Sequence, residues 1–228
     1  FFFKQKTAYE IPKRDWSSDV CSSDLDSDSI PFGKFVRIMS IPHKLGLDPS
    51  RIQFKKYLSS SPERVEFWKD RMGPHKKFRV GLCWKGGRRT QAEMVAIDAR
   101  RSMDPESIRP VLAVEGVEFF SLQKEGQVIP EINDLMGDVD NFVDTAAIIE
   151  NLDLVVTVDT SVAHIAAALG KPTWMMSRKG GCWRWGMEGE LTFWYPSMRI
   201  FRQEEINNWG PVVAKVTEEL KGLVGSSS

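Results

Sequence analysis

Apolar residues along this chain gather in short unbroken runs, and most runs are followed by a longer segment with helical spacing. Residues 154–158 form the plainest run, apolar and β-branched without alternation, as in a strand buried on both faces. Similar runs stand at residues 79–84, 117–122, 173–176 and 198–201. Because such strands alternate with helical patterns, the sequence predicts an α/β fold, a parallel sheet with helices on both faces.

Capping residues and helix breakers mark where the helices begin and end. Pro62 suits a first helical turn, Gly73 follows the last, and Asn141 is a favoured N-cap residue. Residues 88–102 are densely charged and are predicted to form an exposed loop, and residues 132–135 a short strand. The helices expected on these signals span residues 62–72, 105–114, 142–152, 162–169 and 209–224.

One strand–turn–helix unit carries candidate chemistry. Asp159, Thr160 and Ser161 form a turn between the strand at residues 154–158 and the Ala-rich helix at residues 162–169. Such a turn aims the backbone N–H groups of the first helical turn beyond the carboxyl end of the sheet, where an anion is favoured. His164 lies one turn into the helix and leans back over that point. The unit predicts a phosphate site with a histidine over it.

A plainer interpretation of this unit stays open. Asp159, Thr160 and Ser161 are all residues that favour helix N-caps, and capping alone explains their presence. His164 then becomes a packed histidine on an otherwise apolar helix. The turn by itself favours neither interpretation.

Two other loops bring basic or aromatic side chains to carboxyl ends of predicted strands. Lys85 follows the strand at residues 79–84 and is placed to meet a phosphate, because ligands of open α/β sheets bind outside those ends. Trp183, Arg184 and Trp185 follow the strand at residues 173–176. The two indoles form either a wall for a nucleobase or sugar, or a cluster that packs the loop onto the domain.

Composition excludes several function classes. Lys plus Arg and Asp plus Glu number 31 each, which gives no case for a nucleic-acid partner or an anionic membrane. No glycine-rich dinucleotide fingerprint follows a strand, no cysteine pair has zinc-type spacing, and no apolar run is long enough for a membrane span. We therefore expect no metal or cofactor, and a reducing, cytoplasmic setting.

The first 25 residues do not look like a natural protein sequence. Residues 4–10 and 15–25 can be encoded by a common short-read sequencing adapter and its matching primer, in the expected order. We therefore interpret residues 1–25 as a non-native, adapter-derived segment and expect the natural N-terminus to be missing. Residues 26–76 then represent the remnant of an N-terminal domain with a connecting helix, residues 77–224 a complete domain, and residues 225–228 a loose tail.

Residues 153–176, DLVVTVDTSVAHIAAALGKPTWMM, resemble the nucleotide-sugar-binding motif of heptosyltransferase-like glycosyltransferases, family 9, especially bacterial members with upstream tetratricopeptide repeats. The resemblance implies the Rossmann-like C-terminal half of a GT-B fold. It also implies metal-independent, inverting transfer from a nucleotide-diphosphate sugar to an unknown glycan, lipid or protein acceptor. The resemblance further implies the missing N-terminal domain and a repeat region as partners in cis. Because the acceptor site and the base are expected in that domain, we expect the chain to be inactive alone.

The resemblance also implies roles for individual residues. Main-chain groups of Thr160, Ser161 and Val162 are expected to bind the donor's phosphates, with Asp159 bracing the turn. His164 and Lys85 are expected to stabilise the charge of the leaving group. Arg101 and Ser102 resemble a basic-plus-serine pair that related sequences carry before the next helix, and they too are expected to bind the donor's phosphates. The alternative is a non-catalytic nucleotide-binding or scaffold module of a repeat protein.

Overall fold

The computed structural model describes residues 41–48, 54–87, 92–126 and 129–225. The chain divides into two units, residues 1–54 and residues 55–228. Within the first unit, the described part contains one short helix, α1 (Ile41–Lys44). The segment interpreted as adapter-derived, residues 1–25, lies outside the described residues.

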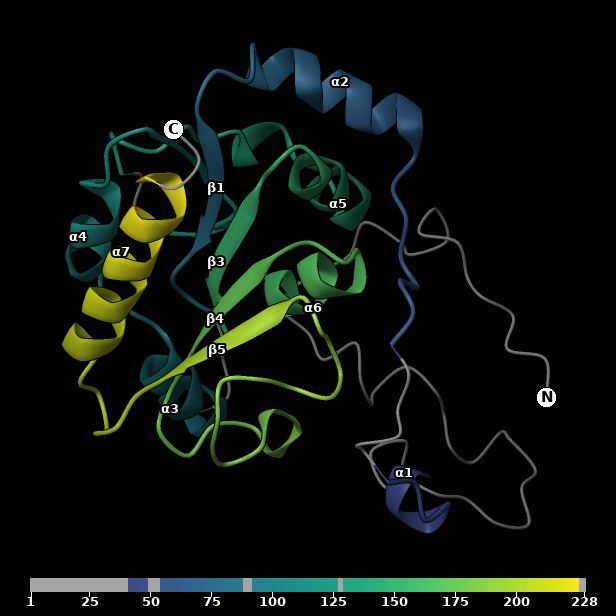
Figure 1. Ribbon diagram of the computed structural model, residues 1–228, viewed down its shortest axis with the longest axis vertical. Coiled ribbons are helices and arrows are strands. Elements are labelled where there is room, and N and C mark those ends of the chain that lie inside the picture. The colour runs from purple at the N-terminus through teal and green to yellow at the C-terminus, as the bar shows by residue number, and fades with distance from the viewer. Residues whose placement is uncertain (1–40, 49–53, 88–91, 127–128, 226–228) are drawn as a thin grey trace. The chain divides into compact units, whose positions relative to one another are not determined.

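A five-stranded, fully parallel sheet organises the second unit (Figure 1). Its strands lie in the order β2-β1-β3-β4-β5, each paired in parallel with its neighbours. The expected α/β, Rossmann-like fold is confirmed. The strands span β1 (Phe78–Cys83), β2 (Val117–Ser121), β3 (Leu154–Val158), β4 (Thr173–Ser177) and β5 (Met198–Arg202).

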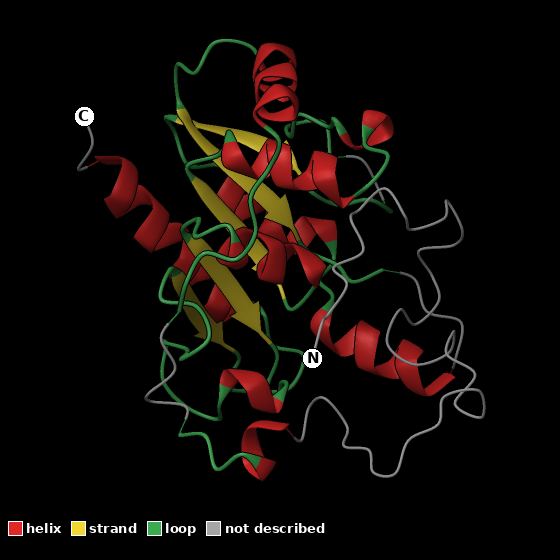
Figure 2. Cartoon of the chain, turned by 90° about the vertical axis from the view of Figure 1, so that its right-hand side faces the viewer, coloured by secondary structure: helices red, strands yellow, loops and turns green. Residues whose placement is uncertain are grey.

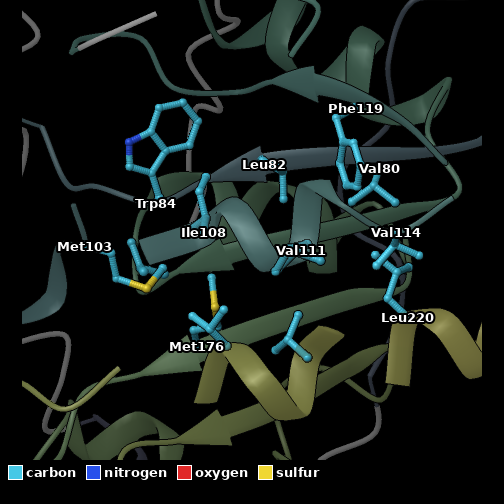
Figure 3. Packing of buried hydrophobic residues seen from close by; sticks show 14 of the residues in the cluster. Val80, Leu82, Trp84, Met103, Ile108, Val111, Val114, Phe119, Met176 and Leu220 are labelled. Atoms are coloured by element: carbon cyan, nitrogen blue, oxygen red, sulfur yellow. The ribbon is translucent and has the colours of Figure 1, made fainter. Parts of the chain in front are cut away.

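Helices cover both faces of the sheet (Figures 1 and 2). Helices α4 (Arg109–Leu112) and α7 (Gly210–Gly225) lie on one face, and α5 (Phe142–Glu150) and α6 (Ser161–Ala168) on the other. Each face has its own apolar cluster, and every residue of β3 is buried between them. Figure 3 shows the α4 and α7 side, where Leu82, Ile108, Val111, Met176 and Leu220 pack together.

Helix α2 (Pro62–Met72) packs against α5 within the same compact unit as the sheet. Trp68 is fully buried and donates its indole N–H to Oδ1 of Asp144, 3.1 Å away. Arg64 donates through Nε to the same carboxylate oxygen at 2.9 Å. The division predicted from the sequence assigns this helix to residues 26–76, and in the structure the helix contacts α5.

Three expected elements differ from the structure. The segment expected as a charged loop contains α3 (Ala92–Arg101), because its alanine, methionine and glutamate residues favour helix despite the charge. The helix expected at residues 105–114 is divided into a 3-10 turn η5 (Pro105–Ile108) and α4, since Pro110 cannot donate a helical hydrogen bond. The strand expected at residues 132–135 is reduced to one bridge between Phe120 and Asn133, followed by η6 (Met136–Asp138).

Among the described residues, no helix combines the length and the apolarity needed to cross a bilayer.

Candidate functional site

The strand order places a crevice between two particular strands. From β1 the chain adds β2 on one side and then crosses over to add β3, β4 and β5 on the other, so the strand order reverses between β1 and β3. Ligands of open α/β sheets bind outside the carboxyl ends of the strands at such a reversal. Cys83, the last residue of β1, is in register with Thr157 of β3. The sequence after β1, which begins with Trp84 and Lys85, therefore leaves the sheet beside the turn that follows β3.

The turn between β3 and α6 (residues 159–161, the β3–α6 turn) leaves its helix without a side-chain cap. Thr160 occupies the N-cap position in an extended conformation, but its hydroxyl makes no capping hydrogen bond. That hydroxyl lies 3.2 Å from Oγ1 of Thr157 and 3.7 Å from Sγ of Cys83, so it binds inward to the two central strands. At α5, in contrast, Asn141 caps the N–H groups of Val143 and Asp144.

The missing side-chain cap at α6 is relevant to the alternative interpretation, in which residues 159–161 only cap the helix. A helix start needs partners for its first N–H groups, and Thr160 supplies none through its side chain. Ser161 is exposed and Val162 is buried, so the donors of the first turn begin at the surface of the domain. An anion at this position could accept hydrogen bonds from these backbone N–H groups, because the Thr160 hydroxyl does not bind them.

Arg101, at the end of α3, reaches across to the β3–α6 turn. Its Nη1 donates to the carbonyl oxygen of Asp159 at 3.0 Å, and its Nε donates to Oδ1 of Asp98 at 2.8 Å. Arg101 therefore links the end of α3 to the main chain of this turn at Asp159. Gly86 makes this arrangement possible, since a Cβ at that position would lie 2.0 Å from Oδ1 of Asp98 and 2.6 Å from Nε of Arg101.

The segment after β1 is held by two side chains. The backbone N–H of Lys85 donates to Oε1 of Gln123 at 2.9 Å, and that of Gly86 donates to Oγ of Ser102 at 3.2 Å. Ser102 thus contacts the backbone of this segment. The side chain of Lys85 is exposed and makes no hydrogen bond or ion pair with any residue that the structure describes. Its ammonium is available to an incoming anion.

His164 is enclosed by aromatic rings. Its imidazole stacks on Trp185 with ring centroids 5.0 Å apart, and its Nδ1 lies 3.1 Å from the hydroxyl oxygen of Tyr195. Burial lowers the pKa of His164 from its ordinary value; the charge of Asp159 opposes this shift and that of Arg184 adds to it. The imidazole therefore favours its neutral form.

The two interpretations of the aromatic residues after β4 can be compared with the burial of these residues. Trp183, Arg184 and Trp185 form the 3-10 turn η7 (Trp183–Trp185). Trp185 is 2% exposed, so its face packs on His164 and forms no open wall for a ligand. The packing interpretation holds for Trp185, while the side chain of Trp183 lies outside what the structure describes. Arg184 is partly buried and lies close enough to His164 to influence its charge.

Sequence reasoning did not single out Arg178, a further arginine at this edge. Arg178 directly follows β4, and burial lowers its pKa from the ordinary value of arginine, with the charge of Arg100 acting in the same direction. Asp159 opposes that shift. Arg178 lies just after a buried strand, as Lys85 does, and this position could have identified it from the sequence. Tyr195, 31 residues from His164 in sequence, has no comparable signal.

Two of the cavities lined by described residues bear on the site. One of about 320 Å³ stands at the carboxyl ends of β1 and β2, where Trp84, Gln123 and Lys124 line it. Gln123 lines this cavity and also accepts a hydrogen bond from the backbone N–H of Lys85, so the cavity lies next to the site. The other, of about 480 Å³, lies at the opposite, amino-terminal edge, lined among others by Arg79, Asp153 and Lys171. No predicted site residue lies in the second cavity.

No group of three or more His, Cys, Asp or Glu side chains is placed to hold a metal ion among the residues that the structure describes.

Comparisons with known proteins relate part of this chain to a glycosyltransferase family. Residues 130–175 match the model of glycosyltransferase family 9 (heptosyltransferase). The match covers β3, α6 and the turn between them, and it ends within β4. It supports a family 9-like glycosyltransferase domain. No solved structure gives a significant match to the chain.

A curated relative resembles a much larger part of the chain. Protein FlbA of Caulobacter vibrioides (strain ATCC 19089 / CIP 103742 / CB 15) is 31% identical over an alignment of 201 residues, and the alignment covers 79% of this chain. The same alignment covers 32% of FlbA, so the chain spans about a third of the length of this relative.

Proposed function

We propose that this chain is the donor-binding half of a glycosyltransferase. It binds a nucleotide-diphosphate sugar, from which the complete protein transfers the sugar to a glycan, lipid or protein acceptor with inversion at the reacting carbon. The single observation that carries the proposal is the uncapped start of α6 at the reversal between β1 and β3, braced by Arg101 through the carbonyl of Asp159. The family match over residues 130–175 supports it.

In this proposal the diphosphate lies over the β3–α6 turn. The backbone N–H groups of Ser161 and Val162 bind phosphate oxygens, and the helix dipole adds to the attraction. Lys85, exposed and without a partner among the described residues, approaches from the end of β1. Arg101 contributes positive charge, although Asp98 already balances part of it.

The chemistry follows from where charge develops. When the bond from the sugar to the diphosphate breaks, negative charge grows on the departing phosphate oxygen. Fixed donors and cations aimed at that oxygen stabilise the transition state more than the ground state. Thr160, Ser161, Val162, His164 and Lys85 supply such groups from this half, so we propose that transfer needs no metal ion.

The cavity of about 320 Å³ beside Gln123 gives room for another part of the donor. Because Gln123 also fixes the backbone of Lys85, a group bound in the cavity lies next to the phosphate position. We therefore propose that the nucleoside extends toward this cavity from the diphosphate.

A thermal-shift titration of the chain with uridine, adenosine and thymidine diphosphates tests the proposal. A ligand at a hundredfold its dissociation constant adds about 2.7 kcal/mol of stability. We expect one diphosphate to raise the melting temperature, with a smaller shift in Lys85→Ala and no change in the shift for the control Lys221→Ala on α7. Equal shifts in both variants, or none with any nucleotide in a folded wild type, would favour a scaffold module instead.

A further inference from the structure

Two aromatic side chains meet the imidazole of His164, and a third reaches it through Tyr195. His164 belongs to α6, Trp185 to η7, Tyr195 precedes β5, and Tyr57 precedes α2. The imidazole meets Tyr195 edge-on, with ring centroids 5.9 Å apart, in addition to its stack on Trp185. Trp185 and Tyr195 are themselves 6.2 Å apart, centroid to centroid. The ring of His164 is therefore held from two sides.

A hydrogen-bonded chain connects this ring to the surface. Nδ1 of His164 lies 3.1 Å from the hydroxyl oxygen of Tyr195, and that oxygen lies 2.8 Å from the hydroxyl oxygen of Tyr57. Tyr195 is 7% exposed, whereas Tyr57 is 58% exposed. The chain thus runs from a half-buried imidazole through a buried phenol to an exposed one.

The direction of these hydrogen bonds decides what His164 offers a ligand. A neutral imidazole has one donor and one acceptor nitrogen, and Nδ1 is the nitrogen that meets Tyr195. A phenol is a stronger acid than a neutral imidazole N–H, and an imidazole nitrogen is a stronger base than a phenol oxygen. The stronger hydrogen bond therefore runs from the hydroxyl of Tyr195 to Nδ1, and the hydroxyl of Tyr57 donates to Tyr195.

Among the described residues, the charged groups that act on His164 come from the β3–α6 turn and from η7. Asp159, in the β3–α6 turn, favours the protonated ring, whereas Arg184, in η7, disfavours it. Tyr195 and Tyr57 are the titratable groups of the hydrogen-bonded chain, and burial raises the pKa of Tyr195 so that it stays protonated. With burial acting against the cation, the ring is neutral and its second nitrogen carries the proton.

We propose that Tyr195 is a positioning residue that donates to Nδ1 of His164 and fixes the neutral imidazole with its proton on Nε2, with Tyr57 completing the chain. This inference rests on the proposed function for its consequence: His164 meets the donor's diphosphate as a neutral hydrogen-bond donor, neither as a base nor as a cation. Neutral histidines can serve enzymes in this way.

The tautomer can be observed directly without any ligand. A two-bond ¹H–¹⁵N correlation spectrum of the ¹⁵N-labelled 228-residue chain at about pH 8, where a histidine of lowered pKa is neutral, separates the Nε2–H and Nδ1–H forms. The sequence holds three histidines, and the signal lost in His164→Gln identifies His164. His75, whose Nε2 lies 2.8 Å from Oδ2 of Asp153 at the other edge of the sheet, is the internal control.

We expect wild-type His164 to show the Nε2–H pattern, and Tyr195→Phe to lose that preference and give a mixture of tautomers, with the His75 signals unmoved. Tyr57→Phe, a change at an exposed ring, should shift Nδ1 of His164 in the same direction by less. An Nδ1–H pattern in the wild type would overturn the proposal. So would an unchanged His164 pattern in Tyr195→Phe or, if that variant does not fold, an unchanged Nδ1 in Tyr57→Phe.

Adding uridine, adenosine or thymidine diphosphate to the same sample separates this proposal from the proposed function. If the tautomer is as proposed and one nucleotide shifts Nε2 more than Nδ1, both stand. If the tautomer is as proposed but no nucleotide moves Nε2, the role of His164 toward the diphosphate is overturned, while its fixation by Tyr195 stands as a property of the fold.

Discussion

Nη1 of Arg101 donates to the carbonyl oxygen of Asp159 at 3.0 Å, which links the end of α3 to the β3–α6 turn. The same guanidinium also holds Asp98, so one planar group serves two acceptors. A lysine has a single ammonium on a flexible stem and cannot reproduce that fork. The geometry of the turn therefore depends on the shape of Arg101 as well as on its charge.

Arg101→Lys should weaken binding of the nucleoside diphosphate, because the turn loses its brace while the positive charge remains. We expect about a tenfold weaker affinity, equivalent to about 1.4 kcal/mol. Calorimetric titration measures this. Arg109→Lys is the control, since Arg109, on α4, forms exposed ion pairs with Glu106 and Glu131. An Arg101→Lys affinity equal to that of the control would contradict the bracing role.

Gly86→Ala should destabilise the fold, and the neighbouring Gly87→Ala should not. A Cβ at Gly86 meets Asp98 and Arg101 at 2.6 Å or less, whereas a Cβ at Gly87 meets nothing within 4 Å. Overpacking of this kind costs about 1–3 kcal/mol. Urea denaturation of the two variants gives the difference, and equal stabilities would show that the Asp98–Arg101 pair moves aside at no cost.

Asp144→Asn should lower stability at neutral pH by about 2 kcal/mol, because the buried carboxylate accepts hydrogen bonds from Arg64 and Trp68. Burial by itself would raise the pKa of Asp144, but the hydrogen bonds from Arg64 and Trp68 outweigh it, and the pKa is lowered. The folded chain thus binds this proton less readily than the unfolded chain. The stabilisation is present above about pH 4, the ordinary range of an aspartate, and is lost as the pH falls through the folded pKa.

The control for Asp144 is Asp138→Asn, which removes an exposed ion pair with Arg71. Exposed pairs contribute about 0–1 kcal/mol, so this variant should remain close to the wild type. Urea denaturation at a series of pH values compares the three proteins. A gap between Asp144→Asn and wild type that persists unchanged at strongly acidic pH would argue against the assigned protonation.

His164 should make stability depend on pH in the neutral range. Burial holds its pKa below the ordinary value, so the unfolded chain binds more protons below about pH 6.5. The contribution is complete above that value and declines as the pH falls toward the folded pKa. Between about pH 7.5 and 5.5 the wild type should therefore lose more stability than His164→Gln. Parallel stability curves for the two proteins would count against a buried, neutral imidazole.

The sequence predicted the elements that bury apolar residues on both sides. The runs at β3 and β4 have no other stable environment than the centre of a parallel sheet, and helix α2 was delimited by Pro62 and Gly73. Helix α3 was missed because charge density was taken as a sign of an exposed loop, although its residues favour helix. The local sequence pattern does not show whether such a charged segment becomes a helix or a loop beside the folded sheet.

The candidate site was predicted in part, for a related reason. Lys85 and Thr160 each follow a strand, so their arrival at one edge follows from a parallel sheet. The contacts of Arg101 with Asp159, and of Tyr195 with His164, join positions 58 and 31 residues apart, and no short-range pattern encodes them. That the hydroxyl of Thr160 turns inward and leaves α6 uncapped also depends on Cys83 and Thr157, on two neighbouring strands.

Amide chemical shifts test most directly whether a diphosphate binds over the start of α6. A ¹H–¹⁵N spectrum of the chain is recorded during titration with uridine, adenosine or thymidine diphosphate. We expect the amides of Ser161 and Val162 to move most, together with Nε of Arg101. Largest movements around Asp153 and Lys171, in the cavity at the opposite edge of the sheet, or no movement at Ser161 and Val162 with any of the three nucleotides, would contradict this expectation.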